Sequence, residues 1–141
     1  MSESDEHLRL GVIDRYGEQK IAEIWLSEAD FEAAYTIKCS LGGGNLISNS
    51  RDGYFDALLK LRIELEQVGM LISCFGASVD VYPSAMQLSM GGARLAYRLT
   101  LGRQALRENI VDIFESDASI IPSTVADQRE FYNEWLESLG D

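Results

Sequence analysis

Histidine and cysteine are scarce in this chain of 141 residues, which has one histidine, His7, and two cysteines, Cys39 and Cys74. A Ser-His-Asp or Cys-His catalytic arrangement needs a histidine fixed beside its partner, whereas His7 adjoins an acidic N-terminal stretch and is expected to be solvated. A structural zinc site built from histidine and cysteine alone takes four such ligands, and the chain has only three of these residues. We therefore expect no catalytic residue, metal site or cofactor, and two free thiols buried as small hydrophobic side chains.

Long apolar runs and prolines are also missing. No stretch approaches the roughly 18 to 20 apolar residues of a membrane helix, and the only prolines are Pro83 and Pro122. Residues 1–6 are acidic, whereas a secretory signal begins basic and then turns apolar. We expect a cytoplasmic protein in which residues 1–7 form a disordered tail and residues 8–141 form a single domain.

Positive charge is sparse, since 12 Lys and Arg stand against 23 Asp and Glu, for a net charge of −11. This balance argues against nucleic acid and anionic membranes as partners and favours a basic protein. The net charge is −6 over residues 1–32, +3 over residues 33–107 and −8 over residues 108–141. Because chain ends often lie close together on a domain, we expect the acidic ends to form one negative face. Solubility is the other explanation for this charge.

Two helices are predicted from apolar residues that recur every three or four positions, over residues 52–69 and 124–139. Each range has a capping side chain at its start and a glycine at its end. These signals are Ser50 or Asp52 with Gly69 for the first helix, and Thr124 with Gly140 for the second. Aromatic residues on the second helix are expected to dock it on a sheet.

About four to six mostly antiparallel strands are predicted beside these helices, which makes the fold class α+β. The expected strands are residues 8–13, 21–25, 70–75, 94–101 and 110–115, with turns at 14–17 and 42–44. In the fourth of these strands the alternation predicts a buried face. That face would hold Leu95, Tyr97, Leu99 and Leu101.

Three segments carry weaker or mixed signals. Residues 27–30, Ser-Glu-Ala-Asp, have the spacing of a helix start, and residues 31–39 fit either a helix or a strand. Residues 76–92 form the longest irregular stretch, in which Pro83 is expected to begin a short helix that ends near Met90. Long loops in small domains are often functional.

Several stretches resemble a family of small, uncharacterised bacterial cytosolic proteins. They are residues 39–46 (CSLGGGNL), 76–78 (GAS), 81–84 (VYPS) and 131–136 (FYNEWL). The likeness spans roughly residues 25–139, and it implies no catalytic residue. In size, acidity and α+β layout the chain is also similar to the immunity proteins of bacterial toxin systems. That class-level similarity implies direct binding and neutralisation of a toxin, often a basic nuclease.

The expected function is therefore an acidic protein-binding module, most concretely an immunity protein for a cognate basic toxin, and not an enzyme. The expected partner contacts are acids near the C-terminus together with two tyrosines. They are Tyr82, Asp112, Glu115, Asp117, Glu130, Tyr132, Glu134 and Glu137. One alternative is a small anion-binding protein or enzyme that uses residues 76–98 with Arg94 and Arg98. Another is a homo-oligomeric structural protein.

Overall fold

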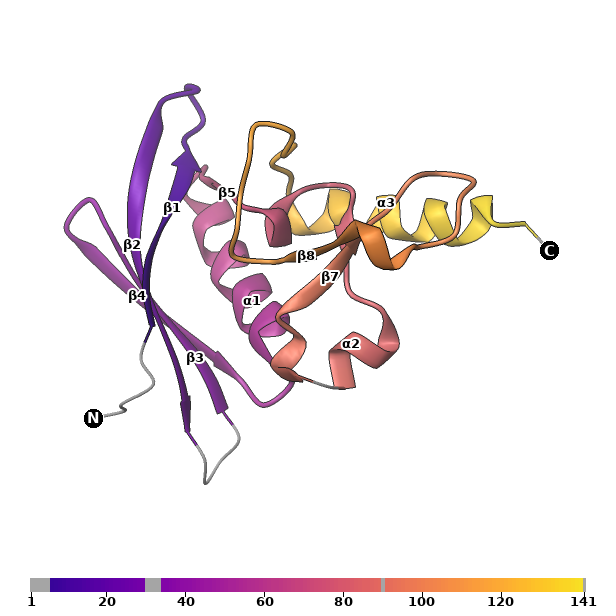
Figure 1. The fold of residues 1–141 in the computed structure, drawn as a ribbon. Coiled ribbons are helices and arrows are strands. Elements are labelled where there is room, and N and C mark those ends of the chain that lie inside the picture. Colours follow the sequence, from indigo (N-terminus) through magenta and orange to yellow (C-terminus); the bar gives the residue numbers. More distant parts are fainter. Residues whose placement is uncertain (1–5, 30–33, 90, 141) are drawn as a thin grey trace.

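The computed structural model describes residues 6–29, 34–89 and 91–140. These residues form a five-stranded antiparallel sheet, a second sheet of three short strands, and helices packed against both (Figure 1). The predicted α+β class, with a mostly antiparallel sheet of four to six strands, is confirmed. The two predicted main helices are also present, as α1 (Tyr54–Gln67) and α3 (Val125–Ser138).

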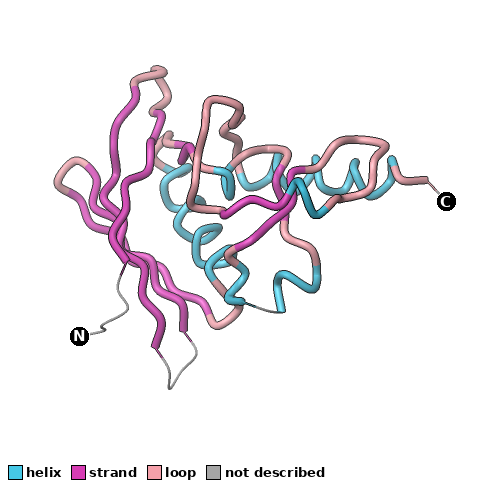
Figure 2. Tube along the Cα trace, viewed as in Figure 1, coloured by secondary structure: helices cyan, strands magenta, loops and turns pink. Residues whose placement is uncertain are grey.

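The five-stranded sheet has the order β4-β3-β2-β1-β5. Its strands are β1 (Glu6–Ile13), β2 (Gln19–Ala29), β3 (Ala34–Leu41), β4 (Gly44–Ser50) and β5 (Leu71–Ser73). Alternate residues point to one face, as the period of a strand requires. The fully buried members of that face are Leu10, Val12, Ala22, Ile24, Leu26, Ile37, Cys39 and Ile72. They form the core, and α1 covers it (Figure 2).

Helix α1 lies in the concave side of this sheet and packs on β3 and β4. Its buried apolar residues follow the predicted spacing, and Gly69 at φ +80° follows its C-terminus. The predicted N-caps are wrong, because Gly53 is the N-cap residue and no capping side chain accepts a hydrogen bond from the backbone N–H groups at the start of α1. The Ser50 hydroxyl instead accepts from the Asp52 amide and donates to Asp56. A side chain at Gly53 has no room, since a Cβ there would lie 2.5 Å from the Gly92 carbonyl oxygen.

The rest of the chain forms a second region beside α1. It contains β6 (Val81–Tyr82), α2 (Ala85–Ser89), β7 (Leu95–Arg98), β8 (Ile110–Asp112) and α3, with short 3₁₀ turns at 75–77, 91–93 and 107–109. The strands pair antiparallel in the order β6-β7-β8. Helix α3 packs against β6 and α1.

Local signals were misleading at two places in the fold. The predicted helix start at residues 27–30 is wrong, because Ser27, Glu28 and Ala29 continue β2 and pair with β3. Long-range pairing overrides a local capping pattern there; Asp30 and residues 31–33 lie outside the described residues. Residues 34–39, which fit either element, belong to β3. Pro83 also precedes the short helix instead of beginning it, because Ser84 and Gln87 cap each other at the start of α2.

The buried face that was predicted for the strand at residues 94–101 is wrong at both ends of that range. Leu95 and Leu101 are 48% and 49% exposed, whereas Ala96 is fully buried. Strand β7 has only four residues, and its small Ala96 faces the core. Leu99 is buried beyond the end of the strand, as a loop residue.

The two acidic ends do not come together. Glu6, the first described residue, begins β1 in the five-stranded sheet. Helix α3 ends on the side of the molecule opposite this sheet (Figure 1). The expectation of one negative face where the chain ends meet is therefore wrong. Glu6 and His7 also belong to β1, not to a disordered tail; residues 1–5 lie outside the described residues.

Among the described residues, no helix has the length and apolar character that crossing a membrane requires.

Candidate partner-binding surfaces

A buried polar hub holds α3 in place. The Arg62 side chain of α1 is almost fully buried and donates to Gln128 Oε1 at 2.6 Å, to the Ser123 carbonyl at 3.0 Å and to the Gly76 carbonyl at 3.2 Å. The Gln128 amide nitrogen donates to the same Gly76 carbonyl and to two others, those of Ser78 and Val81. Burial lowers the pKa of the Arg62 guanidinium from its ordinary value.

Both ends of α3 are anchored as well. Thr124 accepts from the Asp127 amide as the predicted N-cap, and Glu66 of α1 accepts from the Val125 amide at 2.8 Å. Near the other end, the Trp135 indole donates to the Arg103 carbonyl at 2.8 Å. Helix α3 therefore presents its outer side chains from a fixed support.

The exposed side of α3 carries a stripe of four carboxylates. Asp127, Glu130, Glu134 and Glu137 follow steps of three and four residues, which places them on one helical face. All four are exposed, and within the described part of the chain none takes part in an ion pair. We call these four residues the acidic stripe. It contains three of the predicted contact residues.

The two predicted tyrosines lie on a different side of α3. Tyr82 and Tyr132 stack with ring centroids 4.2 Å apart, between Phe55 and Trp135. They border a cavity of about 230 Å³ and are half-buried. A helix turns about 100° per residue, so Tyr132 lies nearly opposite the acidic stripe. The predicted tyrosines and glutamates therefore do not form one surface.

The remaining predicted acids are placed separately. Asp112 forms an ion pair with Arg94 at 3.1 Å, and its side chain also accepts from the Phe114 amide. Glu115 is exposed, and hydrogen bonds from Ser119 lower the pKa of Asp117. Asp112 thus has an internal structural role, while the other two lie on the loop that follows β8.

Arg94 and Arg98 are engaged within the protein. Arg94 donates to both carboxylate oxygens of Glu6 and to Asp112, and lies over the Phe114 ring. Arg98 binds Asp80 and Ser119. Neither arginine borders the cavity beside Tyr82 and Tyr132 or the groove at the β3–β4 hairpin. This arrangement does not favour the anion-binding alternative.

The two cysteines are buried, and the histidine is partnered. Cys39 and Cys74 are buried free thiols, as predicted, and burial raises the pKa of Cys74 to about 11. No cluster of three metal-binding side chains occurs within residues 6–29, 34–89 and 91–140. The expected solvation of His7 is only partly right, because its half-exposed ring stacks on Trp25 and contacts Glu23 at 2.6 Å. Cross-strand pairing of β1 with β2 brings these side chains together.

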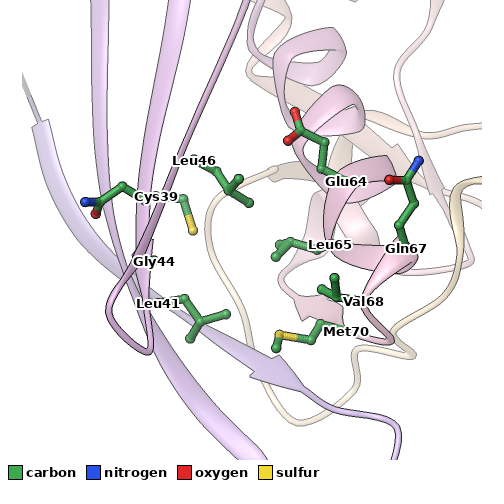
Figure 3. A pocket seen from close by; sticks show the side chains of 10 residues that line it. Cys39, Leu41, Gly44, Leu46, Glu64, Leu65, Gln67, Val68 and Met70 are labelled. Carbon is green, nitrogen blue, oxygen red and sulfur yellow. The ribbon is translucent and has the colours of Figure 1, made fainter.

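A groove that was not predicted lies between the β3–β4 hairpin and the C-terminal half of α1 (Figure 3). Its volume is about 400 Å³, and its lining is mainly apolar, with Glu64 and Gln67 at the helix side. The apolar lining consists of Cys39, Leu41, Leu46, Leu65, Val68 and Met70. Leucines on both sides of the glycine turn were a signal for it in the sequence, but only the position of α1 shows that they border a groove.

No family model matches the chain, and no curated protein matches it either. The resemblances named above therefore stay predictions.

Proposed function

We propose that this protein is an acidic binding module for a basic protein, and most concretely a cytoplasmic immunity protein that neutralises a cognate toxin by direct binding. The observation that carries the proposal is the acidic stripe of α3. Its four carboxylates are exposed and free of ion pairs within the described residues, on a helix with both ends anchored.

Electrostatic steering supports this proposal. The four carboxylates lie on one side of α3, so they would draw a basic partner to that side. Leu136 and Leu139, which are 46% and 38% exposed, follow Tyr132 along the opposite side of the helix, so the proposed contact is chiefly electrostatic.

The test uses a basic toxin-domain candidate from an adjacent gene, titrated into the protein at low salt by calorimetry. We expect a one-to-one complex that weakens as salt is raised, because exposed charges are screened. The variant Glu130→Gln/Glu134→Gln should lower the affinity at least tenfold, at about 0.7 kcal/mol or more for each charge.

A matched control removes the same charge elsewhere. Glu18 and Glu108 are exposed and lie outside α3, so Glu18→Gln/Glu108→Gln should leave the affinity within about twofold. Equal weakening by both double variants would show that net charge, not the acidic stripe, matters. No complex at low salt would contradict the proposal.

A further inference from the structure

The longer of the two edge strands of the five-stranded sheet is β4, which pairs with β3 on one side only within the described residues. An edge strand with unpaired backbone groups is a template for another strand unless charges, prolines or bulges protect it. Strand β4, Gly44–Ser50 (GNLISNS), contains no charged residue and no proline. We propose that β4 pairs antiparallel with β4 of a second copy of this chain, forming a symmetric dimer with one continuous sheet.

The register of the β3–β4 hairpin shows which backbone groups are free. Leu41 and Gly44 flank a two-residue turn, Gly42-Gly43, whose positive φ angles suit a type I′ hairpin. The residues that flank such a turn exchange both hydrogen bonds, and this pattern alternates along the strands. Asn45, Ile47 and Asn49 therefore direct their N–H and C=O groups outward. Only the Asn49 carbonyl has a partner among the described residues, the Lys60 ammonium at 3.2 Å.

Ile47 is the middle residue of β4, and Asn45 and Asn49 lie at equal distances on either side of it. In an antiparallel pair centred there, Ile47 faces Ile47 of the second copy, and Asn45 faces its Asn49. Ile47 is 59% exposed on the open face of the sheet. A β-branched pair across strands is favourable, and no like charges meet along the new edge.

Helix α1 adds a second contact to the same arrangement. It packs on β3 and β4, so the twofold axis beside β4 would bring the two α1 helices to about 10 Å, the usual separation of packed helices. Ser48 bonds the Ala57 carbonyl and Lys60 bonds Asn49, so the middle of β4 lies beside the middle of α1.

The α1 residues at this level are complementary in charge. The twofold axis passes close to the level midway between Lys60 and Glu64, so each Lys60 would face Glu64 of the second copy. Both side chains are exposed, and Glu64 forms no ion pair within the described residues. Helix α3, which carries the acidic stripe, lies across the molecule from β4 (Figure 1), so this inference does not depend on the proposed function.

The test is sedimentation equilibrium of the whole protein from roughly 1 to 500 µM, a range that covers weak and tight dimers. We expect a mass that rises from 15.7 kDa to twice that value. Ile47→Pro removes an N–H that the monomer does not use, so the circular dichroism spectrum should remain that of the wild type. It should raise the dimer Kd by about 100-fold, because two hydrogen bonds are lost and the ring blocks the edge. Ile47→Val is the matched control and should change Kd less than about threefold.

Charge exchange tests the register. Lys60→Glu and Glu64→Lys should each weaken the dimer about fivefold, and the double exchange should restore it to within about twofold. A mass that stays at 15.7 kDa throughout, or a dimer that Ile47→Pro does not weaken, would overturn the inference. If Ile47→Pro instead weakened toxin binding by a monomeric wild type, the edge would belong to the partner, and the proposed function would stand without the dimer.

Discussion

The five-stranded sheet and the region after α1 differ in what holds them together. The sheet has strands of up to eleven residues in continuous antiparallel register, over a core of aliphatic side chains. The later region has strands of two to four residues and depends on side chains that bond backbone carbonyls, chiefly Arg62 and Gln128. Repetitive backbone pairing thus stabilises one region, and a few specific polar contacts stabilise the other.

Among the variants that test this difference, Arg62→Met is expected to lower the free energy of unfolding the most. It removes the donor for Gln128, Gly76 and Ser123 in a buried site. A buried acceptor left without a partner costs about 1 to 3 kcal/mol of unfolding free energy, and both Gln128 Oε1 and the Ser123 carbonyl lose Arg62. Urea denaturation would measure it, and hydrogen exchange should show earlier opening of α3 than of β2.

The matched control for that variant is Lys60→Met, which changes an exposed cation on the same helix and should cost less than about 1 kcal/mol. A similar loss for both variants, or equal loosening of sheet and α3, would show that the hub does not act on the later region in particular.

Gly76→Ala is expected to have the second-largest effect on stability. Gly76 lies where the later region meets α1, and a Cβ there would lie 2.7 Å from Leu58 Cδ2 and 2.9 Å from Ile113 Cβ. Such crowding of a packed interior costs about 2 kcal/mol. In the sheet, Gly11→Ala meets only an ordinary contact at 3.6 Å and should change stability by less than about 1 kcal/mol. Thermal unfolding of both variants tests this, and an equal loss would contradict it.

Thr124→Ala should have a smaller and more local effect. The hydroxyl caps α3 by accepting from the Asp127 amide at 3.0 Å, and loss of an N-cap costs about 1 kcal/mol. Hydrogen exchange should report faster opening at the first turn of α3 while β2 and β3 are unchanged. Thr100→Ala, at an exposed residue, is the control and should have no measurable effect on α3.

The difference between regular backbone pairing and specific side-chain contacts also explains how much of the fold the sequence could predict. Helices α1 and α3, the β1–β2 hairpin and the turn at Gly42 have regular periods or strong terminal signals, and they are present as predicted. The helix start predicted at Ser27 and the burial predicted around Ala96 were wrong. Both features depend on which strand lies alongside, and a local sequence pattern does not contain that information.

The residues of the candidate site also differ in how far the sequence could predict their arrangement. Glu130, Glu134 and Glu137 fall within the predicted helix 124–139, so the face that they share in α3 follows from their spacing of three and four residues. By contrast, the ion pairs of Asp112 with Arg94 and the stacking of Tyr82 on Tyr132 join residues 18 and 50 positions apart. The separation of the chain ends likewise follows from tertiary packing, so net charge per segment could not locate a surface.

The smallest expected effect is at the ion pair that joins the two regions, Arg94 with Glu6. The hydrogen bond from Arg94 lowers the pKa of Glu6 below its usual 4.5. A carboxyl group with a lower pKa in the folded state stabilises the protein above its unfolded pKa, and this contribution disappears as the pH falls through the folded pKa. Glu6→Gln should therefore cost about 0.5 kcal/mol near neutral pH, because the pair is partly exposed and screened, and nothing well below 4.5. Urea denaturation against pH, with Glu108→Gln as control, measures the difference; a cost that persists in acid would mean that Glu6 acts through packing instead of charge.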